Sequence, residues 1–128
     1  MSLIKLRDKL DKEFSLYIRQ KYADDLGNVA CYTCGSVKHW RYQQCGHFIS
    51  RRHLCTRWDE DNCRVQCMGC NVFNQGNTPV FAQKLLTEKG SKIINELLLK
   101  SKGVCKFTRS DYESLINHYK QLNNQNNE

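Results

Sequence analysis

The sequence has no long apolar segment. No run approaches the roughly 18 apolar residues that a helix needs to cross a bilayer. The start, MSLIKLRDKLDKEF, is charged where a secretory signal would have an apolar core. These absences exclude a membrane-spanning chain and argue against export. We therefore expect a cytoplasmic protein with no membrane partner, whose cysteines stay reduced.

Acidic residues are fewer than basic ones. The chain has 13 Asp and Glu against 20 Lys and Arg, a formal net charge of +7. Such a surplus favours a polyanionic partner, because a basic side chain placed against a phosphate releases condensed counterions. Charge alone does not identify that partner. With 128 residues, 40% of them hydrophobic, the chain has enough material for one compact core but not for two.

Cysteine is abundant, with eight residues in the chain. Four of them form two CxxC pairs, Cys31/Cys34 and Cys67/Cys70. Two thiolates at this spacing bind one ion together, and four make the closed tetrahedral shell of structural zinc. We therefore predict one structural Zn²⁺ held by these four residues.

The apolar pattern places helical arms around this zinc-bound centre. We expect an amphipathic helix in residues 1–26, a zinc-bound core in 27–90, a helical region in 91–122 and a frayed tail in 123–128. Within the core, Thr78 is expected as the N-cap of a helix with Pro79 at its first position, and Gly90 would end that helix. A capping box at Ser110–Glu113 would open the last helix.

Between and after the CxxC pairs the pattern is strand, basic connection, strand and helix. Residues 41–66 are predicted to form a β-hairpin whose second strand is Cys63–Gln66. A helix starting near Cys67 would carry Asn71. Zinc-braced units of this order build the ββα-metal nucleases of the His-Asn-His (HNH) type. The predicted fold is therefore α+β, a zinc-bound ββα-metal core flanked by N- and C-terminal helices.

Three polar residues of this core are candidates for catalysis. His47 suits a general base, since an ordinary histidine is largely neutral at physiological pH. Asn62 would fix the connection, and Asn71 would hold Mg²⁺ or Mn²⁺ against the scissile phosphate. Each has a plainer alternative: a zinc-bound or packed histidine, a turn residue, and a polar residue at a helix start.

Several motifs resemble the phage lambda NinG (Rap) recombination-protein family. They are FSLYIRQKYAD, CYTCG, CGHFISRR and RWDEDNCRVQCMGCN with the following Gly76 and Asn77, from about Leu10 to about Gly90. The CxxCN ending is also similar to that of the endonuclease VII type of phage junction resolvase. The resemblance implies an endonuclease acting on branched DNA such as Holliday junctions, in the host cytoplasm if the chain is phage-encoded. It also implies His47 as base, Asn71 as ligand of the catalytic ion and the CxxC cysteines as zinc ligands.

One departure from the His-Asn-His pattern concerns the catalytic metal. Many of these nucleases have a metal-binding Asp directly before the base, where this chain has Gly46. Another oxygen donor is then needed, from Asp59, Glu60 or Asp61, or from water and substrate. Mg²⁺ keeps several waters in most sites, so a sparse protein shell is tolerable. We expect Glu60 and Asp61 to be the candidates beside Asn71.

The remaining cysteines and the central arginines leave two further expectations. Cys45, His53, Cys55 and Cys63 could form a second zinc site, which would remove His47 as a base if it used that residue. Free buried thiols are the alternative for Cys55, Cys63 and Cys105. Phosphate contacts are expected from Arg51, Arg52, Arg57 and Arg64.

The partner expected from the resemblance is branched DNA, cut by a homodimer because a resolvase cleaves two strands. Leu97, Leu98 and Leu99 could supply the dimer interface or pack inside the chain. The competing interpretation is a non-catalytic, zinc-containing DNA-binding accessory protein of recombination. A third is a site-specific nicking or homing-type nuclease.

Overall fold

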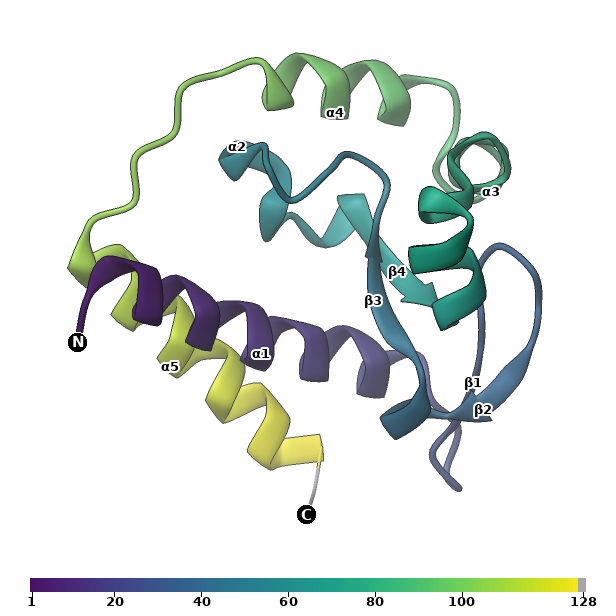
Figure 1. Cartoon of the computed structure of the whole chain (residues 1–128), viewed down its shortest axis with the longest axis horizontal. Coiled ribbons are helices and arrows are strands. Elements are labelled where there is room, and N and C mark those ends of the chain that lie inside the picture. The colour runs from purple at the N-terminus through teal and green to yellow at the C-terminus, as the bar shows by residue number, and fades with distance from the viewer. Residues whose placement is uncertain (127–128) are drawn as a thin grey trace.

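The computed structural model describes residues 1–126 and has mixed helical and small-sheet architecture (Figure 1). The main elements in this part of the chain are α1 (Leu3–Lys21), β1 (Asn28–Ala30), β2 (Val37–His39), β3 (Gln44–His47), α2 (Leu54–Arg57), β4 (Cys63–Gln66), α3 (Thr78–Lys89), α4 (Lys92–Ser101) and α5 (Arg109–Asn126). Short helical turns lie at Trp40–Tyr42, Glu60–Asn62, Gly69–Phe73 and Gln75–Asn77. The predicted α+β class is confirmed.

Helices α1 and α5 lie against each other and form the main core (Figure 1). Every fourth residue of α1 is apolar and buried, which gives the stripe Leu6, Leu10, Phe14 and Ile18. From α5, Tyr119 places its ring edge-on against Phe14, with the ring centroids 5.1 Å apart. Val65 of β4 and Trp58 complete this core. The helix pair therefore supports the β3–β4 hairpin from one side.

The start and end of α5 differ from the prediction. The reciprocal cap is made by Thr108 and Asp111: the Thr108 amide donates to Asp111 Oδ2 at 2.8 Å, and the Asp111 amide donates to Thr108 Oγ1 at 3.1 Å. The helix then continues to Asn126, into the segment expected to fray. It is held there by Asn123, which is buried and donates to the Glu13 carbonyl at 3.0 Å. Residues 127 and 128 of that segment lie outside the described part of the chain.

Two antiparallel hairpins carry the strands. In the first, β1 pairs with β2, with Val29 opposite Lys38. In the second, β3 pairs with β4, with Cys45 opposite Val65 and His47 opposite Cys63. Strand β4 coincides with the strand predicted for residues 63–66. Because side chains alternate along a strand, Cys45 and His47 project from the same face of this hairpin.

Helices α3 and α4 form a second, smaller core. Phe81 and Leu85 of α3 pack with Ile93 and Leu97 of α4, all of them buried. Helix α3 begins at Thr78 with proline in its first turn, and it ends at Gly90, which has a positive φ of 95°. The end agrees with the sequence-based prediction. At the start, Thr78 was predicted as the N-cap, whereas the N-cap is Asn77 and Thr78 is the first helical residue.

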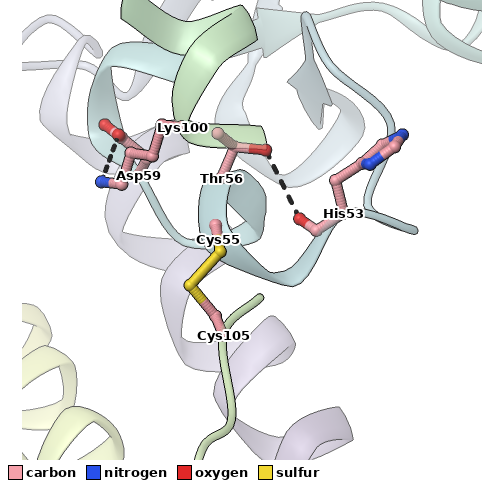
Figure 2. The surroundings of a disulfide bond; sticks show 6 residues. All are labelled: His53, Cys55, Thr56, Asp59, Lys100 and Cys105. Atoms are coloured by element: carbon pink, nitrogen blue, oxygen red, sulfur yellow. Dashed lines mark hydrogen bonds and ion pairs between the residues drawn. A yellow bond between two sulfur atoms is a disulfide. The ribbon is translucent and has the colours of Figure 1, made fainter. Parts of the chain in front are cut away.

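A disulfide between Cys55 and Cys105 ties α2 to the segment that leads from α4 to α5 (Figure 2). Beside it, α4 is held to the region after α2 by an ion pair between Lys100 and Asp59, with the two atoms 2.7 Å apart. The expectation of free thiols for Cys55 and Cys105 does not fit this arrangement. Neither does a zinc-ligand role for Cys55, because its sulfur is bonded to another residue.

Candidate functional site

The two CxxC pairs meet in space. The sulfur atoms of Cys31, Cys34, Cys67 and Cys70 all lie within 4.8 Å of one another. The first pair follows β1 and the second follows β4, so the group connects the two hairpins. Gly35 permits the turn after the first pair because its φ of 80° is accessible to glycine at little cost. This tetrad could hold one zinc ion, as the spacing predicts.

Polar groups surround these sulfur atoms. The Cys70 amide donates to Cys67 Sγ at 3.4 Å, and Asn77 Nδ2 donates to Cys70 Sγ at 3.8 Å. Thr33 Oγ1 lies 3.4 Å from Cys31 Sγ. Such contacts favour thiolates and orient them, as outer-shell partners do in metal sites. The tetrad therefore has the environment of a structural metal centre.

A cleft of about 580 Å³ lies between α1, β3 and the helical turn Gly69–Phe73. Its lining residues are Asp11, Phe14, Ser15, Arg19, Gln43, Gln44, Cys45, His47, Ser50, Arg51, Asn71, Val72, Gln75 and Gly76. Of the residues proposed from sequence, it brings together Cys45, His47, Arg51 and Asn71. The cleft is therefore the natural candidate for an active site.

His47 is held in one tautomer. Its Nε2 lies 2.8 Å from the carbonyl oxygen of Arg57. A carbonyl only accepts, so Nε2 carries the hydrogen and Nδ1 keeps its lone pair. Burial lowers the pKa of His47 below its ordinary value, opposed in part by the hydrogen bond to Arg57. The imidazole is therefore neutral at physiological pH and can accept a proton at Nδ1.

Asn62 is fully buried and fixes the connection between the strands of the hairpin. Its Oδ1 accepts from the Ile49 amide at 2.8 Å. Its Nδ2 donates to the carbonyls of Ile49 and Thr56, each at 3.0 Å. These contacts hold the backbone that follows His47. Asn62 therefore anchors the connection between the two strands.

Asn71 lies in a short π-helical turn, Gly69–Phe73, directly after the last cysteine of the tetrad. Such turns are rare and are often found at functional sites. Its Nδ2 donates to Gln44 Oε1 of β3 at 2.7 Å. This contact turns Oδ1, the atom that can bind a metal ion, away from Gln44. The cysteine tetrad thus sets the position of Asn71 relative to the hairpin.

Gly46 is required by its neighbour Gln66. A Cβ atom at position 46 would collide with the Gln66 carboxamide. Gln66 is fully buried, and its Nε2 donates to Thr33 Oγ1 at 3.1 Å and to the Gly76 carbonyl at 2.8 Å. Its Oε1 has no hydrogen-bond partner among the described residues. A buried amide oxygen without a partner among the described residues therefore lies next to Gly46.

The expected metal ligands Glu60 and Asp61 do not reach Asn71. Glu60 accepts from Lys21 and Tyr119, each at 3.2 Å, and Asp61 lies 3.8 Å from Lys89 Nζ. Neither lines the cleft. The prediction did not fit because the turn Glu60–Asn62 faces the helices, where these carboxylates pair with basic side chains.

The four arginines divide into two groups. Arg51 and Arg52 are exposed, and Arg51 lines the cleft. Arg64 is buried in an ion pair with Glu88 at 2.7 Å, which also lowers the pKa of that carboxyl. Arg57 donates from Nε to Asp11 Oδ1 at 3.0 Å, and this contact raises the pKa of Arg57. The expectation of phosphate contacts therefore fits Arg51 and Arg52 but not Arg57 and Arg64.

Asp11 also lines the cleft, although no sequence motif predicted it there. Besides Arg57, it accepts from Trp58 Nε1 at 2.9 Å, and Arg51 lies 3.7 Å away. It is the single carboxylate among the described residues that line the cleft. In the sequence Asp11 lies between the buried residues Leu10 and Phe14 of α1 and belongs to no recognisable motif. Only the packing of α1 on the hairpin brings it to the site.

A second group of potential ligands differs from the one expected. The sulfur atoms of Cys45 and Cys63 and a ring nitrogen of His47 lie within 4.8 Å of one another. Cys55 is in the disulfide, and His53 is not part of the group. The cluster is therefore Cys45, His47 and Cys63.

No described helix combines the length and the apolarity that a membrane crossing requires.

Comparison with known protein families assigns the chain to one of them. A search of the curated proteins found no match, and a search of the solved structures found none. The family model of the bacteriophage lambda NinG protein matches residues 2–128, almost the whole chain. The chain therefore belongs to the bacteriophage lambda NinG family.

Proposed function

We propose that this chain is a metal-dependent, structure-specific endonuclease that hydrolyses phosphodiester bonds of branched DNA, such as Holliday junctions. The observation that carries the proposal is the meeting of His47 and Asn71 at one cleft. One comes from the first strand of the hairpin, and the other from the helical turn that follows the zinc tetrad. This is the order that an HNH, or ββα-metal, nuclease requires.

The role of the base falls to His47. With Nε2 bound to the Arg57 carbonyl, Nδ1 would take a proton from a water molecule as that water attacks the phosphorus. Asn62 would act indirectly, by holding the connection that follows His47. Burial of the imidazole keeps it neutral and able to act as a base.

The donor set fits a hard divalent ion in a sparse shell. Asn71 lines the cleft, and its Oδ1 is an amide oxygen, which Mg²⁺ and Mn²⁺ accept together with several waters and substrate oxygens. A bound ion would offset the charge that develops on the phosphate oxygens and on the leaving group. The hydrogen bond from Asn71 to Gln44 would hold the ligand side chain in place.

Binding of DNA would rely on phosphate contacts. The net charge of +7 favours a polyanion, and Arg51 lies at the cleft with Arg52 exposed close by in the sequence. The preference for branched DNA follows from the family resemblance, as does action in the cytoplasm of a host cell. Two symmetric cuts would need a homodimer, for which Leu98 and Leu99 of α4 are exposed while Leu97 is buried.

A second candidate function is DNA binding without cleavage. It is favoured by the lack of an unpaired carboxylate among the described residues of the cleft, since Asp11 is already bonded to Arg57 and Trp58. In that case the zinc-bound core would serve as a recombination accessory module.

The test compares a labelled four-way junction with linear duplexes, in Mg²⁺ and in Mn²⁺, using wild type and Asn71→Ala. Cuts in the junction that need the divalent ion and are lost in Asn71→Ala would support the proposal. Tight junction binding without cutting in either metal would overturn it in favour of the accessory module. Preferential cutting of one duplex sequence would overturn it in favour of a site-specific nuclease.

A further inference from the structure

The β3–β4 hairpin places two thiols and an imidazole together. Cys45 and His47 share one face of β3, and Cys63 pairs with His47 from β4. Their ligand atoms lie within 4.8 Å of one another, close enough to converge on one ion after small side-chain rotations. None of the three belongs to the zinc tetrad or to the disulfide.

The donor set selects the class of ion. Thiolate and imidazole ligands suit Zn²⁺, whereas Mg²⁺ and Mn²⁺ prefer oxygen donors. Two thiolates and a neutral imidazole would also cancel the charge of a divalent ion. This matters here because Cys63 is fully buried, and an uncompensated charge at such depth is very unfavourable.

The cluster is open to solvent on one side. Cys45 and His47 line the cleft, while Cys63 lies beneath them. An ion could therefore enter from the cleft and bind three protein ligands, with the fourth tetrahedral position left to water. That arrangement differs from the tetrad, whose four sulfur atoms close the shell.

We propose that Cys45, His47 and Cys63 form a second zinc site, and that its occupation inhibits cleavage. Ligation through Nδ1 takes the lone pair that would accept the proton. Ligation through Nε2 replaces the hydrogen bond to the Arg57 carbonyl that orients the ring. Either way His47 is lost as a base. The inhibition rests on the proposed nuclease function, whereas the binding does not.

Binding is tested with protein that retains the disulfide between Cys55 and Cys105, whose tetrad has been filled by one equivalent of Zn²⁺ and which is then titrated with Co²⁺. Cobalt–thiolate absorption should saturate at one further equivalent in wild type and in the matched control His53→Ala. The absorption should be lost in Cys45→Ser and changed in His47→Ala. Cys45→Ser is preferred to a change at Cys63, because Cys45 is only partly buried. Absence of a second equivalent in wild type, or an unchanged spectrum in Cys45→Ser, would overturn the site.

Inhibition is tested by adding Zn²⁺ to junction cleavage in Mg²⁺, with each rate normalised to that variant's zinc-free rate. The half-inhibiting concentration should rise more than about tenfold in Cys45→Ser, because even outer-shell ligand partners contribute this much to affinity. Cobalt binding without zinc inhibition would overturn the inhibitory role. A wild type that never cleaves would refute the proposed nuclease, while the cobalt titration would still decide the binding site.

Discussion

Replacing Asn62 by alanine removes three hydrogen bonds that hold the connection between β3 and β4. A typical hydrogen bond contributes about 1 kcal/mol net, and buried groups left without partners add to the loss. Because Asn62 is fully buried, water cannot readily take over the hydrogen bonds that its side chain makes. We therefore expect the free energy of unfolding to fall by about 3 kcal/mol, which for a domain of this size lowers Tm by roughly 10 °C.

The assay is urea or thermal unfolding, with zinc saturating and the disulfide in the same state for each protein, because metal binding to the folded chain shifts its stability. Asn71→Ala is the matched control. It removes one hydrogen bond at the edge of the cleft and should change stability by about 1 kcal/mol or less. Asn71→Ala should thus abolish cleavage in a stable protein. An Asn62→Ala variant within about 0.5 kcal/mol of wild type would refute the positioning role.

Three further predictions follow from single contacts. Gly46→Ala should destabilise by about 1–3 kcal/mol through its collision with Gln66, and in urea unfolding the same change should cost less in a Gln66→Ala background than in wild type. Burial lowers the pKa of His47, so the rate of cleavage should fall only below pH of about 6.5. The unfolded chain protonates first, so stability should also drop as pH falls there; an apparent pKa above the ordinary value in the rate profile would contradict this. Reducing the disulfide between Cys55 and Cys105, which spans 50 residues, should lower the free energy of unfolding by about 2–4 kcal/mol, and an unchanged midpoint on adding reductant would contradict it.

Local patterns accounted for much of the fold. Strand β4, the bounds of α3 and the cysteine tetrad each depend on signals within a few residues: alternation, Pro79 with Gly90, and the CxxC spacing. His47 and Asn71 could be proposed together as candidates because their places relative to the hairpin and to the last cysteine follow from the same local order, and both line the cleft.

Contacts between distant segments could not be read from the sequence. Asp11 reaches the cleft only through the packing of α1 on the hairpin, and the same contact engages Arg57. Arg64 pairs with Glu88 of α3, and Glu60 with Lys21 of α1. A charged loop seen alone suggests free ligands and phosphate contacts, whereas the folded chain neutralises several of these charges internally.

The disulfide illustrates the same limit. The expectation of reduced cysteines rested on the absence of a secretory signal. Such a signal indicates the compartment of a protein, but it does not indicate which cysteines lie close together in the fold. Cys55 and Cys105 meet because α4 packs beside α2 and the following segment returns past it (Figure 1). Whether two cysteines lie at bonding distance depends on that packing.

We propose His47 as the base of a metal-dependent nuclease. Single-turnover cleavage of a labelled four-way junction in Mg²⁺ tests this role in wild type and His47→Ala, both with one zinc ion bound and with matching circular dichroism. We expect metal-dependent cleavage by wild type and a rate about 10²–10⁴-fold lower in the variant, the usual contribution of a general base. Equal rates in the two proteins, or no cleavage by wild type, would contradict it.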